Sequence, residues 1–340
     1  MHRKKIKINK MKAVRINEFG GTEVLKIQEI ERPVPAADEI LIKVYASSVN
    51  PADWVVREGE NDFLNPILKL PLILGWDTAG IVEEVGGNVT GFKEGDEVYG
   101  LPNFPGDGSY AEYVAAKASQ FALKPEGISF NEAASVPLAA LVAWTALFEL
   151  GKLQAGQRIF IHGASGGVGS FAVQFAKAKG AYVTGSASTG NQEFLKQIGA
   201  DEAIDYKKQK FEELLQDIDV VFDGAPLRDD NERLKCISVL KEGGIYVSVN
   251  IDFPFSDKVP AALAKKNAKG EVVGSAGYPY SALNQIAQLI NDGKVKVIIS
   301  KIYPLEQVAE AHKESETFHV RSKLVLEIRK ENDKQENSQD

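Results

Sequence analysis

The chain has 340 residues, of which 44% are hydrophobic, and a formal net charge of −7. This length exceeds that of most single domains, and the composition is that of a globular protein, so two hydrophobic cores are expected. Five basic and no acidic residues lie in the first ten positions, so the rest of the chain carries −12, which argues against extensive contact with nucleic acid or anionic lipid. The lone cysteine, Cys236, excludes an intrachain disulfide and a cysteine-rich zinc lobe, and it fits a reducing, cytoplasmic location.

The two ends and one apolar run bound the folded region. Residues 1–10 are basic and lack the apolar segment of a secretory signal, so we expect a flexible N-terminal extension. Residues 329–340 are polar throughout and predict a disordered tail. The longest uncharged apolar run, 133–148, is shorter than the roughly 20 residues that cross a bilayer, and it predicts a buried helix.

The sequence predicts two successive patterns of secondary structure along the chain. Residues 11 to about 120 show short β segments separated by Gly, Pro, Asn and Asp, which predicts a mostly β region. From residue 158 strands alternate with helices, which predicts an α/β region with a parallel sheet covered on both faces. The expected strands are 158–162, 181–186, 203–206, 219–224 and 243–249, and the expected helices are 170–179, 190–198, 210–217 and 229–240. Beyond residue 275 the pattern predicts a helix at 281–293, a strand at 294–300, a helix at 305–316 and a strand at 323–328.

A glycine-rich turn, GASGGVG at 163–169, follows the first strand of this predicted sheet. If a helix starts there, its first backbone amides have no intrahelical acceptor and attract a phosphate group. The dinucleotide pattern Gly-x-Gly-x-x-Gly matches at two of three positions, with alanine at the first. A flexible surface loop is the alternative reading. The flanking strand and helix favour a cofactor site made by Ala164, Ser165, Gly166, Gly167, Val168 and Gly169.

The segment after the second strand bears on which nicotinamide cofactor is used. An Asp or Glu there would bind the ribose diol of NADH, and none is present. Ser186 and Ser188 instead suit a 2′-phosphate, which predicts NADPH. Alternatively, these hydroxyls only cap the helix that starts near Asn191, and both cofactors are accepted.

Six ordered stretches carry a family resemblance: SSVNPADWVVREG, PLILGWDTAGIVEEVG, GDEVYG, GSYAEYVAA, AASVPLAALVAW and the glycine turn with its helix. In order and spacing they resemble the zinc-independent quinone oxidoreductase branch of the medium-chain dehydrogenase/reductase superfamily. The resemblance implies a GroES-like mostly-β catalytic domain at 11–134, a Rossmann-type doubly wound NADP-binding domain at 135–275, and a return of residues 276–328 to the catalytic domain. It also implies a homodimer.

The positions that bind zinc in zinc-dependent relatives carry other residues here. The first is Asn50, the second lies in Gly75, Trp76 and Asp77, and the third falls near Leu138. Zinc prefers thiolate and imidazole ligands, so we expect an enzyme without metal.

Without a Lewis acid, reduction of a conjugated substrate is easier than that of a plain carbonyl, because the developing charge moves to a distant oxygen. The sequence therefore predicts an NADPH-dependent reductase of enones, enals or quinones, acting on a small molecule and not on nucleic acid or a membrane. One rival is a non-catalytic NADPH-binding redox sensor or scaffold, because a tyrosine and a threonine found in relatives are replaced by Val55 and Val142. A zinc alcohol dehydrogenase is the weaker rival.

The resemblance also implies candidate residues near the substrate. Asn50 would face the nicotinamide or the substrate carbonyl, and otherwise it is a turn residue. Asp53 is a tentative catalytic residue that could instead cap a helix. Trp54, Phe104 and Trp144 are candidates for the substrate pocket, with packing as the alternative role.

Three further positions are candidates for cofactor binding. Tyr206 ends the third strand of the sheet and matches a family tyrosine that borders the adenosine phosphate. Asp223 ends the fourth strand, at the edge where cofactors lie, or serves only in a turn. Lys323 matches the lysine of a C-terminal Gly-Lys pattern, although the preceding glycine is replaced by Ser322.

Overall fold

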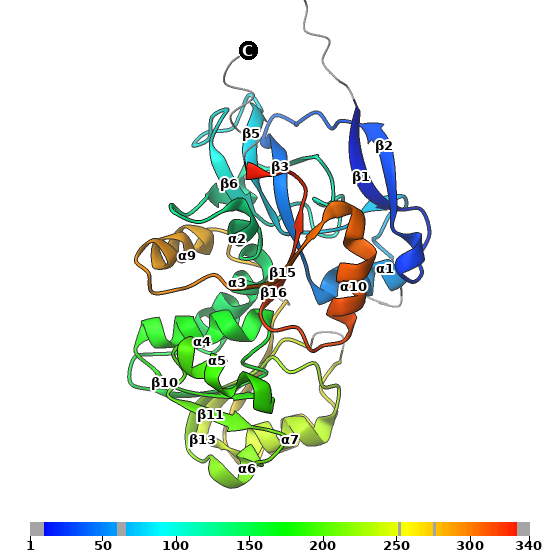
Figure 1. Ribbon diagram of the computed structural model, residues 1–340. Coiled ribbons are helices and arrows are strands. Elements are labelled where there is room, and N and C mark those ends of the chain that lie inside the picture. The colour runs from blue at the N-terminus through cyan, green and yellow to red at the C-terminus, as the bar shows by residue number, and fades with distance from the viewer. Residues whose placement is uncertain (1–9, 60–65, 251–252, 275–276, 332–340) are drawn as a thin grey trace, which may run out of the picture. The chain divides into compact units, whose positions relative to one another are not determined.

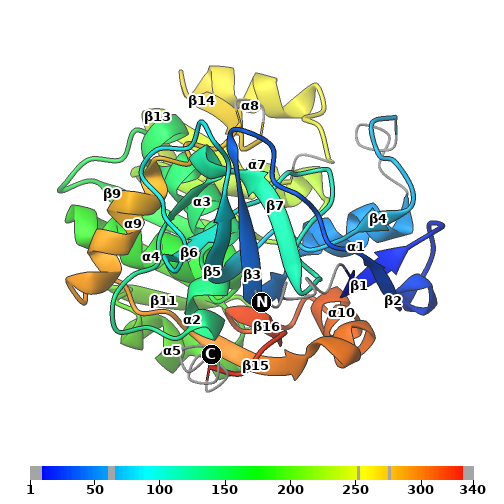
Figure 2. The ribbon, with the colours of Figure 1, turned by 90° about the horizontal axis from the view of Figure 1, so that it is seen from above.

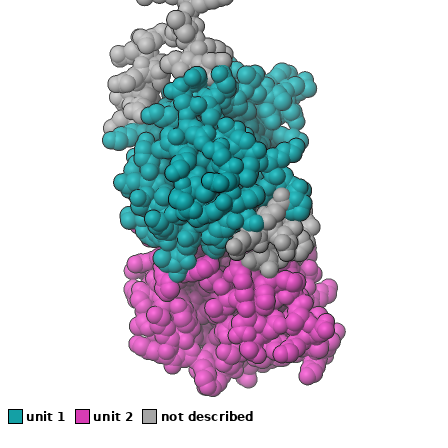
Figure 3. Space-filling model, turned by 90° about the vertical axis from the view of Figure 1, so that its right-hand side faces the viewer, with its two compact units in different colours: residues 1–137, 301–317, 324–340 teal, residues 138–300, 318–323 magenta. Residues whose placement is uncertain are grey.

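The computed structural model describes residues 10–59, 66–250, 253–274 and 277–331. The chain divides into two compact units (Figure 3): unit 1 comprises Met1–Pro137, Lys301–Thr317 and Leu324–Asp340, and unit 2 comprises Leu138–Ser300 and Phe318–Lys323. The sequence predicted that the whole segment 276–328 belongs to the catalytic domain, but the part of it up to Ser300 and the stretch Phe318–Lys323 belong to unit 2.

Unit 1 is built on two sheets. The smaller has the order β2-β1-β4, and the larger has the order β15-β16-β3-β5-β6-β8 with β7 paired to β3 (Figure 2). The strands are β1 (Lys10–Ile16), β2 (Lys26–Glu31), β3 (Glu39–Val49), β4 (Leu72–Ile73), β5 (Thr78–Val85), β6 (Glu97–Gly100), β7 (Tyr113–Lys117), β8 (Phe121–Leu123), β15 (Ile299–Pro304) and β16 (Lys323–Glu327). Alternate residues of β3, Ile40, Ile42 and Val44, point into a core shared with Val82 and Val98, as the period of two in a strand requires.

The helices of unit 1 are α1 (Pro51–Glu58), α2 (Phe130–Ala134) and α10 (Val308–Glu316), with short 3-10 turns at Thr22–Val24, Ala118–Gln120 and Leu305–Gln307. Helices α1 and α10 pack against each other although some 250 residues separate them (Figure 1). This pairing brings side chains from the two ends of the chain into one buried cluster.

Unit 2 contains a six-stranded sheet in which all neighbours are parallel, with the order β11-β10-β9-β12-β13-β14. The strands are β9 (Arg158–His162), β10 (Tyr182–Ala187), β11 (Glu202–Asp205), β12 (Ile218–Asp223), β13 (Leu240–Ser248) and β14 (Lys269–Val272). Numbered from β9, the order is 3-2-1-4-5-6, that of dinucleotide-binding sheets. The order reverses between β9 and β12, so a ligand is expected at the carboxyl ends of these two strands.

Helices cover both sides of this sheet, as the alternation in the sequence predicts. Figure 1 shows α4 (Gly167–Lys179) and α5 (Gln192–Gln197) on one side and α7 (Asp230–Ser238) on the other. The remaining helical segments are α3 (Pro137–Trp144), Thr145–Leu150, Thr189–Asn191, α6 (Phe211–Leu214), α8 (Lys258–Lys265) and α9 (Ala282–Asn291). Among the described residues, none of the helices has the length and apolar character needed to span a bilayer.

Several predicted elements were wrong in detail. The apolar run 133–148 is not one helix: α2 ends at Ala134, and α3 begins at Pro137, a residue that starts helices well because it has no N–H to satisfy. The predicted strand 294–300 starts only at Ile299, and α8 and β14 were not predicted.

The ends of the folded region were also misplaced by a few residues. Lys10 is the first residue of β1, paired with Glu31. Arg329 donates from its backbone N–H to the Tyr45 carbonyl at 3.0 Å, and Glu331 accepts from the Phe130 N–H at 2.6 Å. The rest of the predicted extension and tail, 1–9 and 332–340, lies outside the described residues.

Candidate functional site

The glycine turn of unit 2 joins β9 to α4 and needs glycine at two positions. Gly163 has φ +79°, and a Cβ there would lie 2.9 Å from the backbone of Gly224 and Ala225, which follow β12. A Cβ on Gly169 would lie 2.2 Å from the Gly163 carbonyl oxygen. The turn therefore sits at the place where the strand order reverses, and its first helical turn packs closely on the strand end.

Alanine replaces the first glycine of the dinucleotide pattern without opening the turn. Ala164 is fully buried and donates its N–H to the Ser186 carbonyl at 3.0 Å. Its methyl group faces Gly185, where a Cβ would be only 2.9 Å away. A glycine on the neighbouring strand thus makes room for the side chain that the turn has gained.

The start of α4 offers backbone amides to an anion. Gly166 is the N-cap and provides no side-chain cap, and the first amide bonded within the helix is that of Ser170, which donates to the Gly166 carbonyl at 2.9 Å. The amides of Gly167, Val168 and Gly169 precede it, at the positive end of the helix dipole. This arrangement fits a pyrophosphate group, and it is the place where a dinucleotide cofactor would be held.

A C-terminal segment runs along the same turn. Ser322 donates its N–H to the Ser165 carbonyl at 2.9 Å, and its hydroxyl donates to the Ile298 carbonyl at 2.8 Å. Ser322 has φ 58°, so it keeps the left-handed conformation for which glycine is the usual residue. The methylene chain of Lys323 lies against Gly167, since a Cβ on Gly167 would be 3.1 Å from the Lys323 Cδ. Lys323 is therefore beside the turn, and its contact with a cofactor stays a prediction.

The residues after β10 do not all face the turn. Ser186 is fully buried, and its hydroxyl is 2.8 Å from Nδ1 of His162, which argues against its predicted contact with a phosphate. Asn191 does face the turn: its amide donates to the hydroxyls of Ser188 at 3.2 Å and Ser165 at 3.4 Å. Ser188 is the N-cap of the turn Thr189–Asn191, but its hydroxyl makes no capping hydrogen bond to that turn, and its contact with a cofactor stays a prediction.

At the neighbouring strand ends, Tyr206 and Asp223 differ in accessibility. Tyr206 is 49% exposed at the end of β11 and stays a candidate. The Asp223 carboxylate is buried and accepts from the Tyr246 hydroxyl at 2.6 Å and from the Ala225 N–H at 3.3 Å. Burial raises the pKa of Asp223. The carboxylate therefore orders the turn after β12, so the structure favours the turn role over the cofactor contact.

In unit 1, Asn50 follows β3 and is the N-cap of α1. The Asp53 carboxylate accepts the Asn50 N–H at 2.7 Å, and the same oxygen accepts the Tyr110 hydroxyl at 2.9 Å. Asp53 is fully buried. These bonds assign helix capping to Asp53, the alternative that the sequence had left open, rather than acid or base catalysis.

The orientation of the Asn50 side chain is set by Asp77. A carboxylate only accepts hydrogen bonds, so the Asn50 nitrogen Nδ2 must be the atom 2.8 Å from it. The Ser48 hydroxyl donates to the same Asp77 oxygen, and Asp77 is fully buried. Asn50 is thus held in one amide orientation, with Asp77 as its positioning residue.

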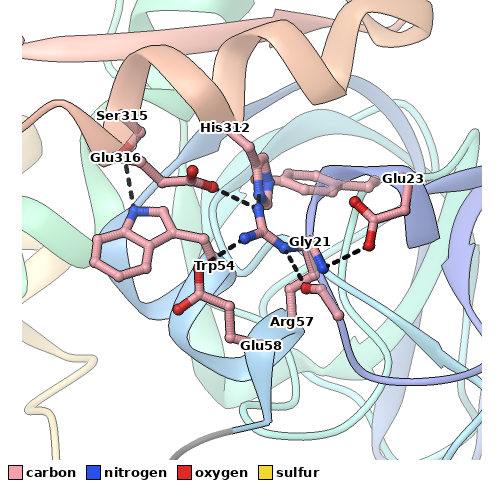
Figure 4. A network of polar contacts seen from close by, with 10 residues as sticks. Gly21, Glu23, Trp54, Arg57, Glu58, His312, Ser315 and Glu316 are labelled. Atoms are coloured by element: carbon pink, nitrogen blue, oxygen red, sulfur yellow. Dashed lines mark hydrogen bonds and ion pairs between the residues drawn. The ribbon is translucent and has the colours of Figure 1, made fainter.

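Asp53 is also one end of a buried chain of hydrogen bonds that runs through Tyr110 and His312 to Arg57, and Figure 4 shows the Arg57 and His312 end of it. The Arg57 guanidinium is 3.1 Å from Nδ1 of His312, and Nε2 of His312 is 3.3 Å from the Tyr110 hydroxyl. Since a guanidinium only donates, Nδ1 accepts and Nε2 carries the proton. The chain is therefore directed from Arg57 through His312 and Tyr110 to Asp53.

Two carboxylates balance the buried guanidinium, and burial keeps the histidine neutral. Arg57 is 1% exposed and pairs with Glu316 at 2.6 Å and Glu58 at 2.8 Å. Burial and the nearby Arg57 charge lower the pKa of His312 to about 3. His312 lies within the helix predicted at 305–316, and no local pattern links it to Tyr110, which lies 202 residues away in the chain.

Two of the three pocket candidates have packing roles. Trp54 is buried and donates its indole N–H to the Ser315 hydroxyl at 3.2 Å, which ties α1 to α10. Trp144 packs edge-on against Phe148 and Phe175 in unit 2. Phe104 is 37% exposed, with its ring 4.9 Å from that of Trp76, and stays a pocket candidate.

Metal-ligating side chains do not gather anywhere in the described part of the chain: no group of three or more His, Cys, Asp or Glu residues could hold an ion there. Cys236, the lone thiol, is buried in the core of unit 2, and burial raises its pKa well above the ordinary value.

Comparison with known proteins identifies the family. Residues 36–126 match the alcohol dehydrogenase GroES-like domain, and residues 198–326 match a domain described as zinc-binding dehydrogenase. The chain is 34% identical to the quinone oxidoreductase of Pongo abelii over 89% of this chain and 93% of that protein. It belongs to the quinone oxidoreductase branch of the medium-chain dehydrogenase/reductase superfamily.

Two further members of the superfamily resemble this chain over most of its length. The NADPH-dependent alkenal/one oxidoreductase of Arabidopsis thaliana is 37% identical over 93% of this chain and 79% of that protein. The solved quinone oxidoreductase of Coxiella burnetii matches with a TM-score of 0.85 at 35% identity, over 94% of this chain and all of the other. The predicted GroES-like and Rossmann-type fold is thereby confirmed, and this quinone oxidoreductase homologue is an NAD(P)H-dependent enzyme for a small-molecule substrate.

Proposed function

We propose that the enzyme uses NADPH, without zinc, to reduce α,β-unsaturated carbonyls or quinones, and that it works as a cytoplasmic homodimer. The zinc-independent part of this proposal, from which the substrate class follows, is carried by the contacts of the Asp77 side chain. Its carboxylate is engaged by Asn50 and Ser48, and neither residue is a thiolate or imidazole donor.

The donor set around Asn50 suits hydrogen bonding rather than metal ligation. Zinc favours sulfur and nitrogen ligands, whereas this corner offers an amide, a hydroxyl and a carboxylate. Without a Lewis acid, a substrate that spreads the developing negative charge itself is easier to reduce than a plain carbonyl. An enone or quinone does so, because conjugation carries the charge to its oxygen.

The residues of the chain would divide the work of binding and positioning. Bound reduced nicotinamide would supply the hydride. The amides of Gly167, Val168 and Gly169 would hold the diphosphate, and Asn50, fixed by Asp77, is the proposed amide near the reacting groups. The proton that completes the product would come late, from water or a hydroxyl.

Support for NADPH over NADH comes from the neutral side chains after β10. The Asn191 amide donates to the hydroxyls of Ser188 and Ser165, and residues 186–191 contain no acid. The Asp205 carboxylate reaches this segment and is engaged by the Thr189 hydroxyl at 2.7 Å. The Arabidopsis relative is also named as NADPH-dependent.

A substrate panel with matched pairs tests the reaction. Purified full-length protein is given NADPH with an enone, the saturated ketone of the same skeleton, an alkenal and a quinone, each before and after exhaustive chelation. We expect oxidation of NADPH with the conjugated substrates only, a saturated product from the enone, and rates that chelation leaves unchanged. Turnover of the saturated ketone, or loss of activity on chelation that zinc restores, would refute the proposal.

Assembly and location need separate measurements. The homodimer is inferred from the family resemblance, and the cytoplasmic location from the single buried Cys236. Sedimentation equilibrium at micromolar protein should give twice the chain mass of 37.0 kDa. Fractionation of cells that express the full chain should recover it with cytoplasmic markers.

A further inference from the structure

The proposed preference for NADPH leaves one requirement unmet. A 2′-phosphate carries close to two negative charges, yet the residues after β10 that face the turn, Ser188 and Asn191, are neutral. Ser186 is bonded to His162 and buried. Neutral hydroxyls permit a phosphate, but preference over an uncharged ribose hydroxyl requires a cation.

Arg321 is the candidate for this positive charge. It lies on the segment Phe318–Lys323, which belongs to unit 2 together with the glycine turn. The next residue, Ser322, is held to the turn by its N–H bond to Ser165 and by its hydroxyl bond to Ile298. The backbone beside Arg321 is therefore anchored at two points.

The Arg321 side chain reaches toward the helix that follows β10. Its guanidinium carbon lies 5.5 Å from the centre of the Phe194 ring, in the first turn of α5. Arg321 itself is exposed, and within the described residues it makes no ion pair. A guanidinium resting on an aromatic ring keeps its edge N–H groups for an anion.

The same corner holds the neutral residues already described. Asn191, just before α5, bonds to both Ser188 and Ser165, while Ser165 also accepts the Ser322 N–H. The glycine turn, the start of α5 and the Arg321 segment thus share Ser165. In a dinucleotide-binding sheet, the ribose next to the adenine lies between the turn and the end of the second strand.

We propose that Arg321 recognises the 2′-phosphate of NADPH and sets the preference over NADH, with Ser188 and Asn191 as its neutral partners. This inference rests on the proposed function, and it assigns the residue that makes the enzyme prefer NADPH. Lys207 is the competing cation: it follows Tyr206 after β11, and it is exposed.

The test is a pair of charge-matched variants, Arg321→Ala and Lys207→Ala, titrated with NADPH and NADH and with the fragments 2′,5′-ADP and 5′-AMP. Binding is followed by calorimetry, so the readout does not depend on turnover. Loss of charge-assisted phosphate contacts should weaken NADPH and 2′,5′-ADP about tenfold to a hundredfold in R321A. NADH and 5′-AMP should change less than about twofold, and K207A should resemble the wild type.

Each other outcome separates this inference from the proposed function. A wild type that prefers NADPH with an unchanged R321A, or a loss that appears in K207A instead, would overturn the role of Arg321 alone. A wild type that binds both dinucleotides equally would overturn the NADPH preference as well. The retained affinity of R321A for 5′-AMP shows that the variant is folded.

Discussion

Replacing Tyr110 by Phe isolates the buried hydrogen-bond chain of unit 1. The substitution removes one oxygen atom and keeps the ring, so packing changes little. It deletes two buried bonds, the donation to the Asp53 carboxylate at 2.9 Å and the acceptance from Nε2 of His312 at 3.3 Å. The Nε2–H of His312 then loses its acceptor in a fully buried place.

The size of the effect follows from these two bonds. A hydrogen bond to a charged group contributes about 1.5–3 kcal/mol, and a buried donor left without an acceptor costs about 1–3 kcal/mol. Because the longer bond is the weaker one, we expect Y110F to lower the free energy of unfolding by about 2–4 kcal/mol. The loss should concern unit 1, where Asp53 caps α1.

The assay is urea unfolding followed by tryptophan emission, since Trp54 and Trp76 both lie in unit 1. Tyr182→Phe is the matched control: its hydroxyl also donates to a carboxylate at 2.9 Å, that of Glu202, but the side chain is 40% exposed. Removal of this exposed bond should lower the free energy of unfolding much less than removal of the buried one. Equal midpoints for Y110F and Y182F would refute the reasoning that burial makes this chain strong.

Two other predictions concern pH and the glycine turn. The pKa of His312 is about 3 in the folded state, below its unfolded value of about 6.5, so the unfolded state binds a proton first as the pH falls. The contribution of neutral His312 to the free energy of unfolding is therefore full above pH 6.5 and decreases by about 1.4 kcal/mol per pH unit as the pH drops toward 3. Glutamine in H312Q does not titrate, and its amide can accept from Arg57 and donate to Tyr110. The free energy of unfolding of H312Q should therefore change less between pH 4 and pH 7 than that of the wild type, and an equal change in both proteins would contradict this reasoning. Gly169→Ala places a Cβ 2.2 Å from the Gly163 oxygen and should abolish dinucleotide binding in calorimetry, whereas Gly87→Ala, with open space at that Cβ, should bind normally. Equal affinities of the two variants would show that the close approach is not required.

Local patterns were sufficient wherever neighbours in the chain decide the structure. The alternation of strands and helices after residue 158 predicted the parallel sheet, because the spacing of apolar residues within each element indicates whether it is a helix or a strand and which side is buried. The glycine turn was found in the same way, since its conformation depends on residues within seven positions. Ordered motifs along the chain are likewise sufficient to indicate the family.

Tertiary structure decided what depends on partners far away in the sequence. The direction of the Ser186 side chain depends on His162, and the role of Asp53 depends on Tyr110. The chain from Arg57 to His312 joins residues 255 positions apart, and Arg321 meets Phe194 across 127 positions. Spacing along a chain carries no record of such pairs, because the sheet order and helix packing that bring them together are settled by burial of the whole core.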